Sequence, residues 1–293
     1  MIVVRIWEGL GNQMFQYAYA RLLKERTGKD VCLEGRRIYR ESLPQEDLSV
    51  ERKCGIYHYN LSLRFIKPEY LAGWSWLAGK NIYQRLRYRL AQRGVGKYLF
   101  LTDADDIFSY QERFLNVRDH TYVMGHFLNR KYFEPVRDIL LREFSLKKRP
   151  ALPPDIEKVL GNEETVSIHI RRGDYLYAEC AQVISKEMRQ GKYYERAVRY
   201  MAEKISHPVI LFFSDDIEWV KENFPCVYKH FYISDMGLED YEELMIMSEC
   251  KNNIIANSTF SFWAGWLNQN KNKIVIAPKH WMPSIVPKDW VQI

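Results

Sequence analysis

The chain has 293 residues, of which 47% are hydrophobic and 27% are charged, a composition typical of globular proteins. No stretch approaches the roughly 18 uninterrupted apolar residues that a membrane span requires, so we expect no transmembrane helix. The formal net charge of +6 is a modest excess, which favours an anionic ligand or surface as a partner. The length allows one large α/β domain or two medium ones.

The cysteines and the first residues both bear on the compartment in which the protein works. The five cysteines are odd in number, scattered and never arranged as C-x-x-C, which favours free thiols over disulfides or a zinc site: Cys32, Cys54, Cys180, Cys226 and Cys250. Residues 1–7 lack the basic region, long apolar run and small-residue cleavage site of a secretory signal. Both features predict a cytoplasmic protein.

The N-terminal half begins with the pattern of a strand, a glycine loop and a helix. Residues 2–6 form an apolar run typical of a buried strand. Apolar residues then recur at helical spacing from Met14 until Gly28 supplies a stop. A second short strand is expected at 31–34, after which residues 35–120 show only weak periodicity and no confident element.

Two segments between the halves have a distinctive composition. Residues 83–97 carry several basic residues and no acid, with aromatic residues interleaved. A solvated helix face explains this composition most simply, and contact with an anionic membrane surface or RNA binding are the alternatives. Residues 132–144 predict a helix, and the three prolines and three basic residues of 147–155 predict a linker, so we place a domain boundary after residue 150.

The C-terminal half repeats a rhythm of strands and helices. Apolar runs predict strands at 165–170, 209–213, 253–256 and 274–277, and the patterns between them predict helices. Such alternation implies an α/β fold with a parallel sheet, whose ligand crevice lies at the carboxyl ends of the strands.

The first of these strands delivers two arginines to that edge. Arg171 and Arg172 carry forked, permanently charged donors that match phosphate oxygens, and Gly173 permits a tight turn after them. A diphosphate ligand fits this arrangement. Standing alone, the motif is more simply explained by a surface ion pair between one of the arginines and Asp174.

Two further strand ends carry polar groups of the same kind. Ser214, Asp215 and Asp216 follow the second strand, where the carboxylates are placed to accept hydrogen bonds from a nucleobase or ribose. Capping of the next helix by Ser214 or Asp215 is the alternative. Ser258 and Thr259 begin an apolar helix whose free N–H groups attract phosphate, with ordinary capping as the alternative.

Two motifs that often mark nucleotide or metal sites give weak signals here. G-L-G-N-Q at 9–13 is not a complete G-x-G-x-x-G, because Met14 stands at the last position, so a dinucleotide site is not indicated. D-A-D at 103–105 matches a metal-binding D-x-D, but it lies beside Asp106 in the irregular region, and helix capping explains it better. We predict no catalytic metal, with arginine charge in its place.

Four ordered motifs together resemble the α1,2-fucosyltransferase family: G-L-G-N-Q-M-F-Q-Y-A at 9–18, H-I-R-R-G-D-Y at 169–175, F-F-S-D-D at 212–216 and N-S-T-F-S-F-W-A-G-W-L at 257–267. The likeness runs nearly end to end and is weakest over 35–120. It implies transfer of L-fucose from GDP-fucose to the 2-hydroxyl of a terminal galactoside. It also implies a GT-B-like α/β fold, in which two Rossmann-like domains face a cleft, with the acceptor-side domain at 1–150 and the GDP-fucose-binding domain at 151–293.

The resemblance also implies roles for the residues of these motifs. The transfer is expected to be inverting and metal-independent, with Arg171 and Arg172 meeting the charge that grows on the departing diphosphate. The residues expected to bind the donor are His169, Arg171, Arg172, Asp215, Asp216, Ser258, Thr259 and Phe260. Those expected near the acceptor or the sugar are Gly11, Asn12 and Gln13. Arg171, Asp174 and Asn12 are expected to be catalytic, with Asp174 as the first candidate for the general base and Glu8 as the alternative.

Two departures from the family pattern bear on the acceptor. Glu8 stands where the family commonly has a second glycine, and Gly125-His126-Phe127-Leu128 stands where G-Y-[FW]-Q is expected. Both changes affect acceptor identity more than donor identity. The partners implied are GDP-fucose and a galactoside-terminated glycan, without nucleic acid. A GDP-fucose transferase of another linkage and a non-catalytic nucleotide-sugar or glycan-binding protein are the alternative functions.

Overall fold

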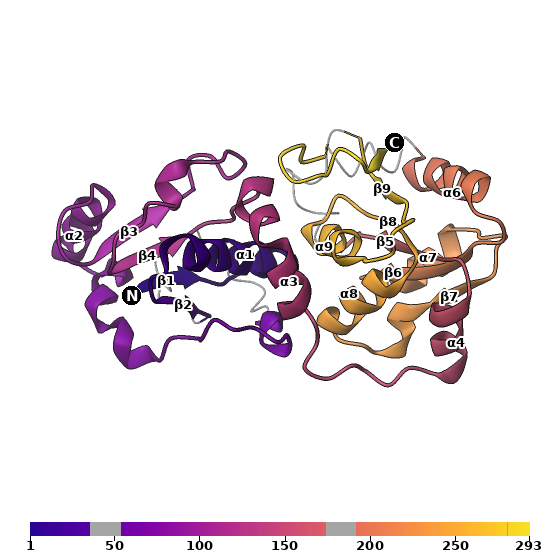
Figure 1. Cartoon of the computed structure of the whole chain (residues 1–293), viewed down its shortest axis with the longest axis horizontal. Helices are drawn as coiled ribbons and strands as arrows, with labels where there is room; N and C mark the ends of the chain where they lie inside the picture. The colour runs from indigo at the N-terminus through magenta and orange to yellow at the C-terminus, as the bar shows by residue number, and fades with distance from the viewer. Residues whose placement is uncertain (36–53, 174–191, 280) are drawn as a thin grey trace. The chain divides into compact units, whose positions relative to one another are not determined.

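The computed structural model describes residues 1–35, 54–173, 192–279 and 281–293, which form two compact units, Met1–Ser145 and Leu146–Ile293 (Figure 1). Each unit is built on its own sheet, and every strand pair in both sheets is parallel. The predicted α/β class with parallel sheets is therefore confirmed. Among the helices of the described ranges, none is long and apolar enough to cross a membrane.

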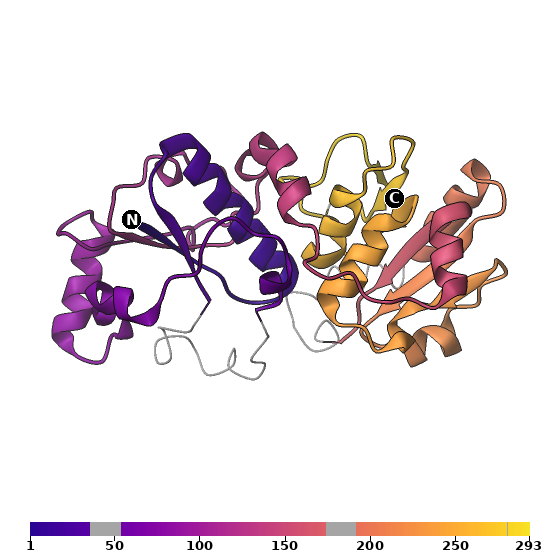
Figure 2. The same ribbon diagram turned by 60° about the horizontal axis from the view of Figure 1, so that its bottom comes forward.

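The N-terminal sheet has the strand order β2-β1-β4-β3. Its strands are β1 (Ile2–Arg5), β2 (Val31–Glu34), β3 (Leu99–Thr102) and β4 (Thr121–Met124). Helix α1 (Leu10–Thr27) packs on β1 and β2 and runs across this sheet in Figure 2, where it is drawn in indigo. It ends at Gly28, whose φ of 64° is a left-handed conformation that glycine adopts without strain.

The region for which the sequence predicted no confident element contains short helices and the strand β3. The 3₁₀ helices of this unit are η2 (Gly55–His58), η3 (Pro68–Ala78), η4 (Glu112–Phe114), η5 (Arg130–Tyr132) and η6 (Glu134–Val136). Its remaining α-helices are α2 (Ile82–Gln92) and α3 (Arg137–Glu143). The helix predicted at 132–144 is wrong in its first half, because Pro135 lies in a 3₁₀ turn and the α-helix begins only at Arg137.

The C-terminal sheet has the strand order β10-β9-β8-β5-β6-β7. Its strands are β5 (Thr165–Ile170), β6 (Val209–Ser214), β7 (His230–Tyr232), β8 (Asn252–Ile254), β9 (Val275–Ala277) and β10 (Val291–Gln292). Its helices are α4 (Pro154–Asn162), α6 (Tyr193–Lys204), α7 (Ile217–Asn223), α8 (Asp240–Glu249) and α9 (Thr259–Leu267), with the 3₁₀ helix η8 (Ile233–Met236). The four strands predicted in this half are all present, with ends shifted by a few residues.

Helices cover both faces of this sheet, which explains why its central strands are buried along their whole length. On one face, Ile168 of β5 packs in a cluster with Met201 of α6 and Val220 of α7. On the other face, Ser167 Oγ accepts a hydrogen bond from Asn253 Nδ2, which also donates to the Met247 carbonyl oxygen of α8. A doubly covered parallel sheet leaves only its strand ends open to a ligand.

Candidate functional site

The carboxyl edge of the C-terminal sheet gathers most of the residues predicted to bind the donor. The strand β5 lies between β6 and β8, and its last residue, Ile170, pairs with Ser214 at the end of β6. The two arginines that follow β5 therefore emerge beside the two aspartates that follow β6. At the same edge, the ring of His169 lies 5.3 Å from the ring of Phe260 on α9, measured between centroids.

Each arginine forms an ion pair with one of the aspartates. Arg171 Nη1 lies 3.0 Å from Asp215 Oδ2, and both side chains are about one-fifth exposed. Arg172 Nε donates to Asp216 Oδ2 at 2.9 Å, and the Arg172 guanidinium carbon lies 3.7 Å from the centroid of the Trp219 ring. The backbone N–H of Arg172 also donates to Asp215 Oδ1 at 2.8 Å. The guanidinium groups are thus held at the strand ends by defined partners.

These contacts change part of the sequence interpretation. An ion pair was expected with Asp174, which lies outside the described residues, whereas the partners found for the arginines are Asp215 and Asp216. The helix cap expected from Ser214 or Asp215 is made instead by Asp216, whose Oδ1 accepts from the Trp219 N–H at 3.3 Å. Local sequence could not settle this choice, because all three residues are competent caps at adjacent positions.

Ser214 and Gly173 shape the backbone at the carboxyl edge of the C-terminal sheet. Ser214 Oγ donates to the Ile170 carbonyl oxygen at 2.7 Å, and the Ser214 N–H donates to Ser234 Oγ at 3.0 Å, so this serine ties neighbouring segments together. A Cβ on Gly173 would lie 2.4 Å from Asp215 Oδ2. A side chain at this position would displace the carboxylate that holds Arg171, which favours glycine here.

His169 is buried and neutral. Burial, assisted by the positive charge of Arg171, lowers the pKa of His169 to about 3. Its Nδ1 atom is buried and has no hydrogen-bond partner among the described residues. A neutral imidazole with a buried nitrogen at a ligand edge is suited to a hydrogen bond with an uncharged group, such as a nucleobase or a ribose hydroxyl.

The start of α9 carries the cap that ordinary helix chemistry predicts. Ser258 is the N-cap residue, and its Oγ accepts from the Phe260 N–H at 3.3 Å. Ser261 Oγ accepts from the Ala256 N–H at 3.1 Å and so fixes the approach to the helix. The capping alternative therefore holds for Ser258, and a phosphate role for Ser258, Thr259 and Phe260 stays a prediction.

In the N-terminal unit, the predicted residues of the glycine loop hold the loop itself. Gln13 Nε2 donates to the Glu8 carbonyl oxygen at 2.8 Å, and Gln13 Oε1 accepts from the Ile56 N–H at 3.2 Å. Gln13 is thus a buried structural residue. Asn12 is half-buried, and its Nδ2 donates to the Glu8 carboxylate. Gly11 is buried in the first turn of α1.

The carboxyl edge of the N-terminal sheet holds a second charged cluster. His126 Nε2 lies 3.2 Å from the Glu8 carboxylate, and His126 Nδ1 lies 4.0 Å from Asp103 Oδ1. Burial alone would lower the pKa of His126, but the hydrogen bond and charge of Glu8 and the charge of Asp103 outweigh it, so that this pKa lies above its ordinary value. Burial also raises the pKa of Asp103, and this effect outweighs the hydrogen bonds from backbone N–H groups, which lower it.

The D-A-D motif at 103–105 has a different role from the expected one. Asp103 Oδ2 accepts from the N–H groups of His126 at 2.7 Å and of Phe127 at 3.0 Å, and Asp106 Oδ1 accepts from the Phe108 N–H at 3.0 Å. No helix begins there, so the helix-capping interpretation is wrong: Asp103 holds the segment that follows β4, and Asp106 stabilises the turn that follows it in sequence. Across the part of the chain that the structure describes, no group of three His, Cys, Asp or Glu residues is arranged to hold a metal ion.

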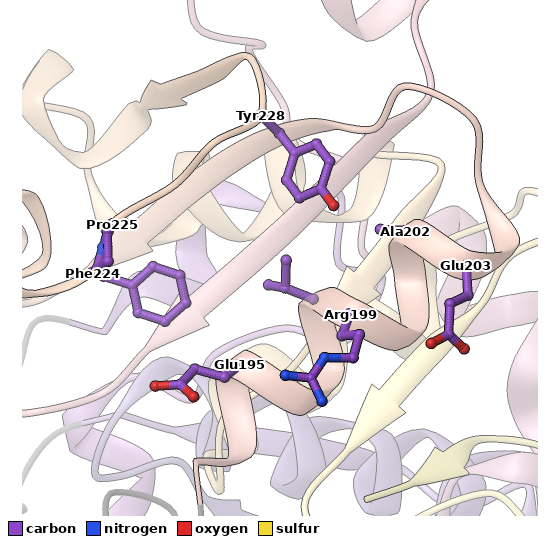
Figure 3. A pocket seen from close by; sticks show the side chains of 8 residues that line it. Glu195, Arg199, Ala202, Glu203, Phe224, Pro225 and Tyr228 are labelled. Atoms are coloured by element: carbon purple, nitrogen blue, oxygen red, sulfur yellow. The ribbon is translucent and has the colours of Figure 1, made fainter.

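The C-terminal unit also has a shallow pocket away from this edge. It measures about 460 Å³ and is bordered by side chains of α6 and of the segment 224–228 (Figure 3). That segment leads into the first residue of β7, so the pocket lies at the amino end of this strand. It is therefore separate from the carboxyl edge at which the arginines lie.

Comparisons with known proteins agree with these features. The family model described as "Glycosyl transferase family 11" matches residues 101–291. The O-antigen biosynthesis glycosyltransferase WbnK of Escherichia coli is 30% identical over 93% of this chain and 92% of its own length. An α-1,2-colitosyltransferase of Escherichia coli is 27% identical over 100% of this chain and 99% of its own. The solved structure of an Arabidopsis thaliana FUT1 mutant in complex with GDP covers 94% of this chain and 69% of its own at a TM-score of 0.50 and 14% identity, which shows a shared GT-B-like fold.

Proposed function

Because this chain belongs to glycosyl transferase family 11, we propose that it transfers L-fucose from GDP-fucose to the 2-hydroxyl of a terminal galactoside. The predicted resemblance to the α1,2-fucosyltransferases is confirmed by the family match and the relatives, and both support an enzyme that uses a nucleotide-sugar donor. The galactoside acceptor, inversion at the anomeric carbon and independence from metal ions are our proposals.

The observation that carries the proposal is the pair of guanidinium groups at the carboxyl end of β5. As the glycosidic bond breaks, negative charge grows on the β-phosphate and positive charge grows on the sugar ring. Arg171 meets the phosphate charge, supported by Arg172, while Asp215 and Asp216 hold the two side chains in place. Donors that are fixed before the reaction stabilise this charge without reorganising. His169 and Asp215, with Asp216, contact the guanine and the ribose.

On the acceptor side, Asn12 and Gly11 lie near the reacting sugar, at the start of α1. The hydroxyl oxygen attacks the anomeric carbon from the face opposite the diphosphate, which inverts the configuration. Asp174 stays a prediction for the general base, since no geometry is described for it. Gln13 acts by holding the loop rather than by touching the sugar, because its side-chain Nε2 donates to one backbone group of the protein and its Oε1 accepts from another.

The direct test is an assay with the purified full chain, GDP-fucose and lactose or N-acetyllactosamine in the presence of EDTA. We expect GDP release coupled to a fucosylated product whose linkage is assigned by NMR. Loss of activity in EDTA that manganese restores would contradict the metal-independent mechanism. A product of another linkage would favour the alternative transferase.

The identity of the donor sugar is tested by repeating the same assay with a second donor. A relative that covers the whole chain is named a colitosyltransferase, so GDP-colitose is the competing donor. Turnover with GDP-colitose and not with GDP-fucose would overturn the fucose assignment while leaving the arginine chemistry intact. Calorimetry that detects GDP-fucose binding, with no transfer to any glycan of a galactoside array, would favour a non-catalytic binding protein.

We also propose that α2 contacts an anionic membrane surface. Three apolar side chains of this helix are highly exposed, with Ile82 and Tyr83 each 83% and Leu86 56% accessible. Arg85 and Arg89 are exposed on the same helix, and exposed apolar groups beside basic ones are typical of helices that lie on anionic lipid. The alternative prediction of a purely solvated face explains the arginines but not the apolar side chains.

Vesicle co-sedimentation tests this contact. We expect binding to vesicles of phosphatidylcholine with phosphatidylserine, weak binding to phosphatidylcholine alone, and loss of binding in the double variant Ile82→Glu and Leu86→Glu. The control Glu25→Gln, on the exposed part of α1, should bind as the wild type does. Equal sedimentation of the double variant, or salt-sensitive RNA binding that GDP does not compete, would contradict the proposal.

A further inference from the structure

Three adjacent strands of the N-terminal sheet bring a titratable side chain to the same edge. In the order β1-β4-β3, Glu8 follows β1, His126 follows β4 and Asp103 follows β3. The carboxyl ends of parallel strands meet at one edge of a sheet, where ligands bind in folds of this class. Glu8 is thus brought together with two residues that lie more than 90 positions later in the sequence, in a cluster that the sequence did not predict.

The contacts in this cluster form a chain from the interior to the surface. The Asp103 side chain is only 6% exposed and anchors the backbone N–H groups of His126 and Phe127. The His126 side chain is 20% exposed and contacts both carboxylates, and its ring lies 5.0 Å from the ring of Trp7. The Glu8 side chain is 34% exposed and is the outermost member. Glu8 is therefore the member that a substrate reaches first.

The backbone at Glu8 is held in a conformation that favours glycine. Its φ is +64°, in the left-handed region, and Phe127 beside His126 has a φ of +56°. Non-glycine residues in this region persist where the surrounding contacts determine them, and such strain concentrates at functional sites. Glu8 and His126 are also two of the three positions at which this chain departs from the family pattern given above, the third being Leu128, and they are in direct contact.

From this geometry we propose that Glu8 and His126 act as one proton acceptor for the hydroxyl group of the acceptor sugar, with Asp103 as a positioning residue. The proposal rests on the proposed transferase function, in which Asn12 lies near the reacting sugar. Asn12 donates a hydrogen bond to Glu8, which places Glu8 near that sugar as well. The acceptor O–H proton passes to the Glu8 carboxylate and is shared with His126 Nε2. The hydroxyl oxygen forms its bond to the anomeric carbon, and the bond from that carbon to the β-phosphate oxygen breaks with its electron pair leaving on GDP.

The pair can accept a proton when Glu8 is ionised and His126 is neutral, with the remaining ring proton on Nδ1, on the side of Asp103, and Nε2 unprotonated. Glu8 and Asp103 are the titratable groups that contact His126 among the described residues, and both raise its pKa. At a pH below that pKa the pair is already protonated, so transfer should slow. On the acid side of the pH profile, kcat/KM should therefore rise with pH as the Glu8–His126 pair loses its proton, and this rise is the acid limb that the variants below should change.

The test uses the full chain and separates proton transfer from donor binding. Glu8→Gln should lower kcat for transfer by about 10²-fold or more, with the affinity for GDP-fucose measured by calorimetry unchanged. It should also move any remaining acid limb to lower pH, because the charge that raises the His126 pKa is gone. His126→Phe should remove the part of the limb that belongs to the imidazole. Asp103→Asn keeps an oxygen for both N–H groups and should move the limb to lower pH with little loss of kcat at its plateau.

Two further variants guard against a trivial loss of folding. Glu8→Gly installs the residue that the backbone conformation favours, so its melting temperature should not fall below that of the wild type, while its transfer should fall as in Glu8→Gln. Glu25→Gln, which alters a surface carboxylate paired with Arg21, should leave transfer and pH profile unchanged.

The outcomes are distinguishable. If the wild type is active and Glu8→Gln keeps its turnover and its acid limb, the inference is overturned while the proposed function stands. If donor affinity falls as much as turnover, Glu8 acts on donor binding and the inference is again overturned. If the wild type transfers fucose to no galactoside, the proposed function fails, and the inference that rests on it fails with it.

Discussion

The substitution Asp103→Ala removes a buried carboxylate on which two backbone N–H groups depend. Asp103 Oδ2 accepts from His126 N at 2.7 Å and from Phe127 N at 3.0 Å, and the side chain is 6% exposed. Alanine leaves both donors without this acceptor. The Phe127 backbone, which has a positive φ, also loses the contact that holds it.

The expected cost follows from these two donors. A buried donor that loses its partner costs about 1–3 kcal/mol, so two donors cost roughly 2–6 kcal/mol. Removal of the carboxylate also relieves the burial of a charge, which is why its pKa is raised, and this relief offsets part of the loss. We expect a net loss of about 2–4 kcal/mol in the free energy of unfolding.

Urea unfolding followed by tryptophan fluorescence measures this loss, and a loss of that size lowers the midpoint by on the order of 1–2 M. Asp105→Ala, two positions away and exposed, is the matched control and should change stability by less than about 0.5 kcal/mol. Asp103→Asn should retain most of the stability, because its amide oxygen accepts both N–H groups. If Asp103→Ala unfolds at the same urea concentration as Asp105→Ala, the hydrogen-bond reasoning is refuted.

Three further predictions concern the C-terminal unit. Arg171→Lys should lower turnover by roughly 10²–10³-fold in the transfer assay, since a point charge does not reproduce the guanidinium fork, and wild-type turnover in this variant would contradict the role. His169 is neutral when folded but takes up a proton when unfolded, because its pKa falls from 6.5 to about 3, so stability should drop with decreasing pH below 6.5. The advantage of the wild type over His169→Gln should shrink by about 1.4 kcal/mol per pH unit in denaturant titrations at pH 6 and 5, and a constant difference would argue against a buried neutral ring. Gly265→Ala should cost about 1–3 kcal/mol, because its Cβ would lie 2.9 Å from Val275 Cγ1, whereas Gly161→Ala in α4 meets no atom within 4 Å and should stabilise the protein; equal melting temperatures for the two would count against this packing argument.

The sequence alone predicted the features that depend on local pattern. Four of the six strands of the C-terminal sheet appear as hydrophobic stretches of up to six residues, so their positions and the parallel sheet could be inferred from the residues themselves, whereas the shorter β7 and β10 were missed. The strands β3 and β4 have four residues each, as do β1 and β2, but they lie in or beside the stretch of weak periodicity at 35–120, without the adjoining helix pattern that marked β1 and β2, and they were missed. The arginines were found because a charged pair directly after a buried strand must emerge at the carboxyl edge.

What only the tertiary structure decided is which of these groups meet. The sequence offered Asp174 as the partner of the arginines, whereas β5 and β6 pair in a register that brings Asp215 and Asp216 to them. Glu8 and His126 were each noted as departures from a family pattern, but they are 118 residues apart, and no local signal pairs them. Local pattern reports how each segment buries its own apolar face, while contacts between distant side chains depend on the strand order and register that the whole sheet adopts.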